Sequence, residues 1–326
     1  MTELCDLTAT EARRRIGTKE ISPVELLEAC ITRTEAVNPT VNSMVTTCYD
    51  RARAEAKVAE KQALGGEPLG LLHGLPFGSK DLESTGGVRT TMGSQLFADN
   101  VPDHDQGSIA EIRANGGILI GKTNTPEFGA GANTRNLVFG ATGNPFDPEM
   151  SCAGSSGGSA VSLATGMVPL ATGSDYGGSL RTPASFCGVV GFRPSPGVVP
   201  NELRSVGLNP FSVLGPMGRT VADAALLLSA MIDDDPRDPF GSGIDPELAE
   251  PLQPADLASL RVAISEDLGV SPLDNDIREC FRRKIDTIRH IFSDAQDHDP
   301  PFDDDLHRAF EVLRCVNYLS AHGEKV

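Results

Sequence analysis

Hydrophobic positions recur at helical spacing through roughly the first sixty residues. Ser22-Pro23-Val24-Glu25 has the form of a capping box with proline at the first helical position, and apolar residues then follow at Leu26, Leu27, Cys30 and Ile31. Asn38-Pro39 predicts the end of this helix, because proline disfavours helical backbone in the residue before it. A further helix is expected over residues 50–63, which Gly65-Gly66 would end.

From Leu71 onward the pattern changes, and short apolar runs alternate with helical stretches and glycine-rich loops. Strands are predicted at residues 41–47, 75–80, 117–121 and 260–264. Helices are predicted at residues 108–113, 220–231, 276–292 and 303–318. Alternation of this kind is typical of an α/β protein with a largely buried sheet.

Composition and charge narrow the class of protein. The 326 residues are 39% hydrophobic and 22% charged, as in ordinary globular proteins. The net charge of −17 would repel phosphate backbones, and Trp is absent, so we expect no nucleic-acid partner. The acidic run at residues 233–239 lacks the spacing of a calcium loop and is expected to be solvated.

Cysteine usage and hydropathy indicate the compartment. The seven cysteines are an odd number without a CxxC pair, which argues against a disulfide framework and a cysteine-rich zinc site. Reduced thiols are the default in a cytoplasm. The first residues lack the apolar core of a signal peptide, and no apolar run reaches the ~20 residues that span a bilayer. We therefore expect a cytoplasmic protein without membrane contact.

Two clusters of glycine and serine, at residues 154–159 and 175–179, flank an apolar run at 160–171. A flexible linker would have the same composition, but linkers seldom enclose an apolar run. Glycine lets a ligand approach the main chain closely, and serine adds a potential nucleophile. The pattern therefore favours an active-site core.

Two further motif matches lack the flanking strands and helices that their motifs require. Residues 116–123 match a P-loop, but a predicted helix precedes them and their interior is strand-like. Residues 154–158 match the G-x-S-x-G elbow, but the preceding segment contains two prolines and cannot be a central strand. A Ser-His-Asp hydrolase remains an alternative, with its histidine at 290, 298, 307 or 322.

Lys80 is the other candidate for a base that activates serine. A lysine accepts a proton only when neutral, so burial or a nearby cation must lower its pKa from ~10.4. Lys80 follows the apolar run Leu75-Pro76-Phe77 and is expected at the end of a buried strand. A surface lysine paired with Asp81 is the competing interpretation.

Taken together, these motifs resemble the amidase signature family. The resemblance spans roughly residues 5 to 265 and rests on segments that follow one another in family order: Lys80-Asp81, 121–128, Asn144-Pro145, 154–159, 173–181, Pro183-Ala184, 187–194 and 215–217. It implies a three-layer α/β/α sandwich with a mixed central sheet. It also implies one amidase-like domain over 1–326, with a helical part (1–66), a catalytic core (67–232) and a partial C-terminal part (233–326). Since family members run longer, we expect a fold truncated at its C-terminus.

The resemblance also implies roles for individual residues of a Ser-cisSer-Lys site. Ser179 would be the nucleophile, Ser155 the bridging serine behind a cis peptide bond, and Lys80 the base. Main-chain N–H groups at Tyr176, Gly177 and Gly178 would bind the oxyanion. The supporting residues would be Ser156, Asp175 and Arg181. Residues 128–132 are expected to line the acyl pocket or, equally, to form a tight packing turn.

The function that this resemblance implies is hydrolysis of a small carboxamide through a serine acyl-enzyme, without metal or cofactor. A non-catalytic or truncated amidase-like protein is one alternative. Another is the amidase subunit of a tRNA-dependent amidotransferase, although Thr182 stands where glutamine is expected in that subgroup. The expected partner is a small amide, and a homodimer is left open.

Overall fold

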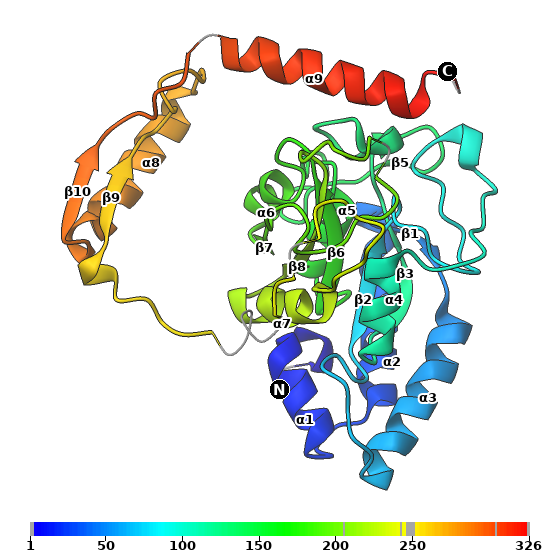
Figure 1. The fold of residues 1–326 in the computed structure, drawn as a ribbon. Helices are drawn as coiled ribbons and strands as arrows, with labels where there is room; N and C mark the ends of the chain where they lie inside the picture. The colour runs from blue at the N-terminus through cyan, green and yellow to red at the C-terminus, as the bar shows by residue number, and fades with distance from the viewer. Residues whose placement is uncertain (1–2, 205, 242, 246–251, 304, 325–326) are drawn as a thin grey trace. The chain divides into compact units, whose positions relative to one another are not determined.

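The computed structural model describes residues 3–204, 206–241, 243–245, 252–303 and 305–324. Contacts divide the chain into two compact units, Met1–Leu252 and Gln253–Val326. The single domain over 1–326 stays a prediction. Figure 1 shows the order of the elements.

The first unit contains the elements predicted for an α/β protein. Its helices are α1 (Ala9–Gly17), α2 (Pro23–Val41), α3 (Tyr49–Gly65), α4 (Gly107–Ala114), α5 (Gly157–Ala164), α6 (Arg181–Cys187) and α7 (Val221–Met231). Its main strands are β1 (Met44–Thr47), β2 (Pro76–Lys80), β3 (Ile118–Thr123), β6 (Leu170–Asp175), β7 (Val190–Gly191) and β8 (Val213–Gly218). A short antiparallel pair, β4 (Arg135–Asn136) and β5 (Gly140–Ala141), lies between β3 and α5 in the sequence.

The six main strands form one sheet in the order β1-β3-β2-β6-β8-β7. Strand β2 runs parallel to both of its neighbours, β3 and β6, whereas the other pairs are antiparallel. The sheet is therefore mixed, as predicted. All five residues of β2 are buried, because this strand has neighbours on both edges and helices on both faces.

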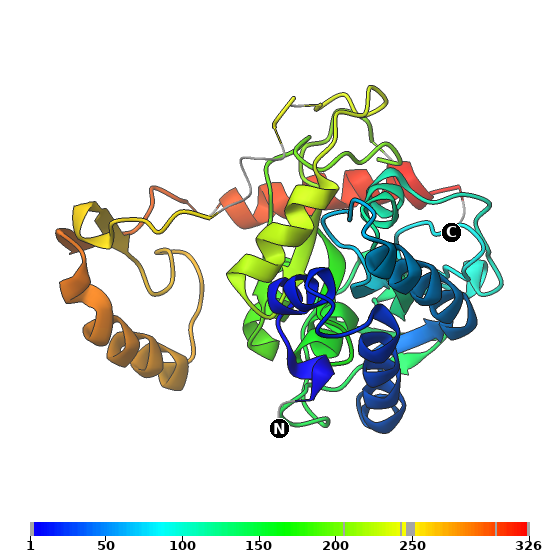
Figure 2. The same cartoon turned by 90° about the horizontal axis from the view of Figure 1, so that it is seen from below.

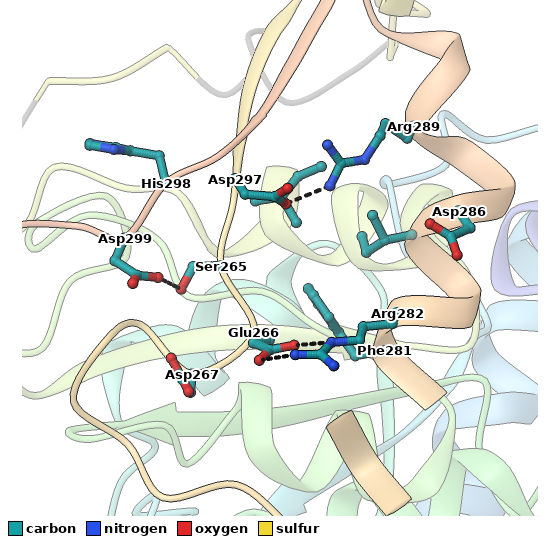
Figure 3. Close-up of a pocket in the computed structure, with 12 residues that line it drawn as sticks. Ser265, Glu266, Asp267, Phe281, Arg282, Asp286, Arg289, Asp297, His298 and Asp299 are labelled. Atoms are coloured by element: carbon teal, nitrogen blue, oxygen red, sulfur yellow. Dashed lines mark hydrogen bonds and ion pairs between the residues drawn. The ribbon is translucent and has the colours of Figure 1, made fainter. Parts of the chain in front are cut away.

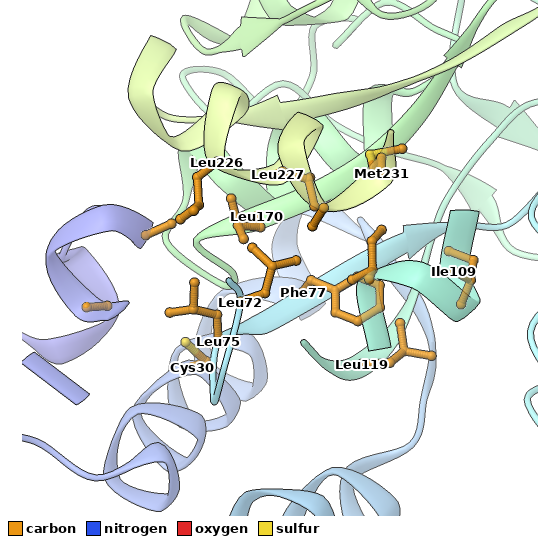
Figure 4. Close-up of a cluster of buried hydrophobic side chains, with 14 of the residues drawn as sticks. Cys30, Leu72, Leu75, Phe77, Ile109, Leu119, Leu170, Leu226, Leu227 and Met231 are labelled. Atoms are coloured by element: carbon orange, nitrogen blue, oxygen red, sulfur yellow. The ribbon is translucent and has the colours of Figure 1, made fainter. Parts of the chain in front are cut away.

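Helices cover both faces of the sheet, which confirms the three-layer prediction. Alternate residues of a strand point to opposite faces, and β3 shows this: Leu119 joins one hydrophobic cluster, whereas Ile118 and Ile120 join the other. The first cluster, drawn in Figure 4, packs the sheet against α1, α4 and α7. The second packs it against α3, α5 and α6. Helices α1 and α7 lie side by side in Figures 1 and 2.

Helix α2 departs from the prediction at its C-terminus. Both halves of the capping box at Ser22 and Glu25 are present, but the helix continues through Pro39. Only Thr40 and Val41 follow Pro39 in the helix, so the hydrogen bond that proline removes lies in the last turn and little helix depends on it. The helix ends at Asn42, which takes a left-handed conformation and donates its N–H to the Asn38 carbonyl at 2.7 Å.

The acidic run at residues 233–239 is only partly solvated, so that prediction was wrong for two of its residues. Asp235 and Asp238 are buried. The Asp235 carboxylate binds Arg237, and the Asp238 carboxylate binds the Arg204 guanidinium at 3.3 Å and the Asn201 N–H at 2.9 Å. Arginine partners offset the cost of removing these carboxylates from water.

The second unit contains β9 (Arg261–Ile264), α8 (Asn275–Ile288), β10 (Asp294–Asp297) and α9 (Asp305–His322), and β9 pairs with β10 in parallel. The strand β10 was not predicted. A hollow of about 690 Å³ lies among β9, α8 and the segment after β10. Figure 3 shows its two labelled arginines on acidic partners, with Arg282 on Glu266 at 2.8 Å and Arg289 on Asp297 at 2.5 Å.

Hydropathy of the helices bears on membrane contact. Within the described ranges, none of the helices has both the length and the apolar character needed to cross a bilayer.

Candidate active site

Strand β2 carries Lys80 to the centre of the first unit. Lys80 is the last residue of this strand and is 0% exposed. Its Nζ lies 2.7 Å from Ser155 Oγ, 2.8 Å from Ser156 Oγ and 2.9 Å from Ser174 Oγ. An ammonium group has three hydrogens to donate, so three hydroxyls match its capacity. The competing interpretation, a surface lysine paired with Asp81, does not hold.

Burial changes the acid–base character of this amine. Desolvation lowers the pKa of Lys80 from 10.5 to about 7, and the negative charges of Glu83 and Asp175 oppose this effect only in part. A large share of the molecules therefore carries neutral Lys80 near pH 7. In that form the amine can accept a proton from a hydroxyl in contact with it.

The first glycine-serine cluster forms the start of α5 and places two hydroxyls on Lys80. Ser155 and Ser156 are both buried, and the Gly154–Ser155 peptide bond is cis. Ser156 Oγ accepts from the Lys80 amine and, at 3.3 Å, from the Ser174 N–H. Ser156 therefore contacts the lysine directly, and its supporting role stays a prediction.

Gly158 allows α5 to approach the end of β3. A Cβ at this position would lie 2.2 Å from the Asn124 main-chain N and 2.6 Å from its carbonyl O. We expect Gly158→Ala to lower the free energy of unfolding by about 3 kcal/mol, because the clashing atoms belong to the backbone and cannot move aside. Chemical denaturation monitored by circular dichroism measures this loss.

Gly207→Ala is the matched control, because a Cβ there would have no atom within 4 Å. Its free energy of unfolding should stay within about 0.5 kcal/mol of the parent value. Equal denaturation midpoints for the two variants would contradict the close packing of α5 on Asn124.

The second glycine-serine cluster is a turn organised by Asp175. The buried carboxylate accepts from the N–H groups of Gly178 at 2.8 Å and Leu180 at 3.1 Å, and from the Arg181 guanidinium at 3.0 Å. Arg193 donates to it as well, at 3.1 Å. Desolvation alone would raise the pKa of Asp175, but the hydrogen bonds from Arg181, Gly178 and Leu180 outweigh it and lower the pKa to about 2. The turn is therefore held by an ionised carboxylate.

Ser179 reaches the site through the main chain. Its carbonyl accepts from the Ser156 N–H at 3.2 Å, which ties the second cluster to the first. Its side chain is half-buried, and its hydroxyl hydrogen-bonds to none of the described residues. The structure thus brings Lys80, Ser155 and Ser156 into direct contact, and the main chain of Ser179 adjoins them.

The turn at residues 175–179 engages the N–H of one predicted oxyanion donor, Gly178. This residue has φ +110°, and its N–H donates to the Asp175 carboxylate at 2.8 Å. The N–H groups of Gly177 and Ser179, by contrast, have no acceptor within the described part of the chain. Tyr176 packs its ring against Phe211 at 5.6 Å between centroids. Gly178 therefore serves the turn, and oxyanion binding by this segment stays a prediction.

Sequence reasoning missed two residues of this site, Ser174 and Arg193. Ser174 lies two positions after Thr172 in β6, so both side chains point to one face of the sheet, and Thr172 Oγ1 accepts from the Lys80 N–H at 3.1 Å. The alternation of hydroxyl residues in this strand was a usable indication. Arg193 follows β7, and nothing in the local pattern indicated its contact with Asp175.

The histidines of the first unit do not contact these serines. His73 Nε2 lies 2.9 Å from the Ala59 carbonyl, and no histidine among the described residues of that unit hydrogen-bonds to Ser155, Ser156 or Ser179. One group of described residues, Glu3, Cys5 and Asp6, is close enough together to hold an ion. Arg33 binds both of its carboxylates, at 2.7 and 3.2 Å, so an arginine already balances their charge.

Comparison with known proteins shows which family the chain resembles. Residues 25–317 match the family model described as Amidase. A glutamyl-tRNA(Gln) amidotransferase subunit of Chloroflexus aurantiacus is 37% identical over 292 residues, which are 89% of this chain and 60% of that protein. An acylamidase of Rhodococcus erythropolis is 39% identical over 271 residues, 83% of this chain and 57% of that protein.

Solved structures show the same fold. A bacterial aryl acylamidase of the amidase signature enzymes has a TM-score of 0.85 at 29% identity and covers 98% of this chain and 68% of its own. A 6-aminohexanoate cyclic dimer hydrolase in complex with its substrate has a TM-score of 0.78 at 31% identity, with 91% and 61% covered.

The chain spans about 60% of the length of the curated amidotransferase subunit that it matches. The family match nevertheless extends across most of the chain, and the fold agrees with that of solved members. The chain therefore belongs to the amidase family, the amidase signature enzymes.

Proposed function

We propose that this protein hydrolyses the C–N bond of a small carboxamide through an acyl-enzyme on Ser179. The observation that carries the proposal is Lys80, a buried amine whose Nζ lies 2.7 Å from the Ser155 hydroxyl. Its pKa of about 7 makes it a base in the pH range where an ordinary lysine is protonated. Serine becomes a nucleophile only when such a base removes its proton.

The proton moves along a short relay. Neutral Lys80 accepts the proton of Ser155, and Ser155 accepts the proton of Ser179 as the Ser179 oxygen attacks the carbonyl carbon. A bond forms between that oxygen and the carbonyl carbon, and the carbonyl π electrons move to the oxygen. Ser156 and Ser174 hold Lys80 in place throughout, at 2.8 and 2.9 Å from its Nζ.

The oxyanion that develops is stabilised by main-chain donors. The N–H groups of Gly177 and Ser179 have no acceptor within the described residues, and Asp175 orders the turn that presents them. Losing one such donor typically costs ~3 kcal/mol of transition-state stabilisation. Lys80 then returns its proton through Ser155 to the departing nitrogen, the C–N bond breaks, and water later releases the carboxylic acid by the same relay.

Gly129 lies close to both Ser155 and Leu82. A Cβ on Gly129, which has φ +69°, would lie 2.7 Å from Leu82 Cδ1 and 3.5 Å from the Ser155 oxygen. A side chain at this position would therefore press on Leu82 next to the serine hydroxyls. This closeness to Ser155 is compatible with residues 128–132 as a wall of the acyl pocket and equally with a tight packing turn.

The relatives support an amide substrate and also a second candidate. Two of them are an acylamidase and a 6-aminohexanoate cyclic dimer hydrolase. The similarity to a glutamyl-tRNA(Gln) amidotransferase subunit favours, as the second candidate, release of ammonia from an amide within a complex of several chains.

A panel of amides tests the proposal and separates the two candidates. Ammonia or amine release is measured with aryl amides, short aliphatic amides and glutamine. Hydrolysis of aryl or aliphatic amides supports the amidase, and activity confined to glutamine supports the amidotransferase role. Absence of turnover and of any covalent acyl-enzyme on the whole panel would contradict both.

The pH dependence of turnover follows from the pKa of Lys80. Protonated Lys80 cannot accept a proton, so kcat/KM should fall about tenfold per pH unit below about 7 and level off above it. The profile is measured with an uncharged amide, so that titration of the substrate does not contribute. A rate that is constant between pH 5.5 and 8 would exclude Lys80 as the base.

A further inference from the structure

A second buried lysine lies on the strand next to Lys80. Lys122 of β3 is 0% exposed and is paired in register with Ser79 of β2. Its Nζ donates to Ser79 Oγ at 2.8 Å, to Thr85 Oγ1 at 2.9 Å and to the Glu83 carbonyl at 2.5 Å. The serine relay makes no use of this group, yet burying a lysine is costly.

A buried carboxyl group connects the two lysines. Glu83 is 1% exposed, and its Oε2 accepts from Ser79 Oγ at 3.1 Å and from Thr172 Oγ1. Thr172 Oγ1 already accepts from the Lys80 N–H, and Ser79 Oγ already accepts from Lys122, so both hydroxyls direct their hydrogens at Glu83. Burial raises the pKa of Glu83, and the Lys122 charge and the two hydroxyl donors act against this rise. Two hydroxyl donors on one oxygen are the arrangement that suits an ionised carboxylate.

We infer that Glu83 and Lys122 are positioning residues that set the protonation state of Lys80. The inference rests on the proposed function in one respect, which is that Lys80 acts as the base in the hydrolysis. The Glu83 carboxylate favours a proton on Lys80, and the Lys122 ammonium, held one hydroxyl away from that carboxylate, offsets this effect. Burial can therefore lower the pKa of Lys80, because the Lys122 charge limits the opposing effect of Glu83.

The other charged groups around the two lysines do not substitute for Glu83. Asp175 faces Lys80, but the charges of Arg181 and Arg193 balance that of its carboxylate.

The ionisable groups that act on Lys122 are Asp81, Glu83, Cys48 and Asp105. Asp81 accepts from the N–H and hydroxyl of Thr91, and Asp105 binds Arg113. Among these carboxylates, Glu83 alone acts on both lysines.

Removing each partner should therefore move the pKa of Lys80 in opposite directions. Glu83→Gln keeps the shape and an acceptor but removes the negative charge, so the pKa of Lys80 should fall by about one unit. Lys122→Met removes the positive charge and leaves Glu83 to act on Lys80 alone, so the pKa should rise by about one unit. A pair that merely held β2 against β3 would affect stability without this opposition of sign.

The test uses the full chain with isotope-labelled lysine and follows the Lys80 side-chain resonance by NMR from pH 5 to 10, with Lys80→Met for assignment. The pH profile of kcat/KM is recorded for the same variants. Glu83→Asp and Lys122→Arg retain charge and should leave the Lys80 pKa within about 0.3 units of the parent value. Surface variants Glu67→Gln and Lys61→Met are the matched controls for loss of a charge, and neither should move it.

Shifts of equal sign, or no shift, in Glu83→Gln and Lys122→Met would overturn the inference. Should Lys122→Met not fold, Lys122→Gln keeps an N–H donor for Ser79 and carries the same expected rise. The unsubstituted protein supplies a further readout, since the labelled Glu83 carboxyl carbon should shift as each lysine loses its proton. A flat Glu83 resonance across that range would also overturn it.

The NMR titration separates this inference from the proposed function. If the pKa of Lys80 shifts in opposite directions in Glu83→Gln and Lys122→Met but no amide is turned over, the inference about Glu83 and Lys122 holds and the proposed amidase function is contradicted. If amides are turned over but the pKa of Lys80 stays the same in both variants, the proposed function holds and this inference is contradicted.

Discussion

Replacing Ser179 with alanine is expected to lower kcat/KM for amide hydrolysis by about 10⁴-fold or more, the scale seen when a nucleophile is removed from a serine hydrolase. The Ser155 hydroxyl is held on Lys80 at 2.7 Å, whereas the Ser179 hydroxyl hydrogen-bonds to none of the described residues and is free to attack. Without it the relay has no final oxygen. Steady-state ammonia release measures the loss, and mass spectrometry should show no acyl-enzyme.

The fold should survive this substitution. The bond that joins the two clusters uses the Ser179 carbonyl and the Ser156 N–H, both of which alanine retains. Ser185→Ala, on the exposed side of α6, is the matched control and should keep parental activity. If Ser179→Ala kept a tenth or more of the activity, the nucleophile would have to be another residue.

Replacing Lys80 with methionine is expected to slow acylation by about 10³-fold, within the range that a positioned base contributes. Methionine fills most of the space of the buried stem but has no group that accepts the Ser155 proton. Lys80→Arg should be equally impaired, because a guanidinium keeps its proton throughout the accessible pH range. Stopped-flow measurement of the acylation burst with an aryl amide gives the rate directly.

A control variant and a folding measurement accompany the Lys80→Met experiment. Lys57→Met removes a lysine from the exposed face of α3 and should leave the burst unchanged. Circular dichroism of Lys80→Met should show the parental fold, since the sheet around β2 is held by its neighbours β3 and β6. A full burst in a folded Lys80→Met variant would mean that a different base operates.

Local pattern was sufficient for most elements of the first unit. The capping box at Ser22, the glycine pair after α3 and the apolar start of β2 each depend on neighbours a few residues away, and the helices and strand formed near the predicted positions. The predicted end of α2 at Asn38-Pro39 was wrong because the cost of Pro39 depends on how much helix follows it. The prediction for Asp238 was wrong because its partner Arg204 lies 34 positions away in the sequence and meets it only in the fold.

Residue pattern alone singled out the segments proposed to hold the chemistry: the apolar run that ends at Lys80 and the two glycine-serine clusters. It did not show that Ser174, 94 positions from Lys80, completes the three hydroxyl partners of that lysine, or that the Gly178 N–H serves Asp175; both came from the three-dimensional packing. The same holds for the pKa of Lys80 and for the Glu83–Lys122 pair beside it. Desolvation and hydrogen bonding between buried groups depend on distances in space, and no local pattern of residues contains those distances.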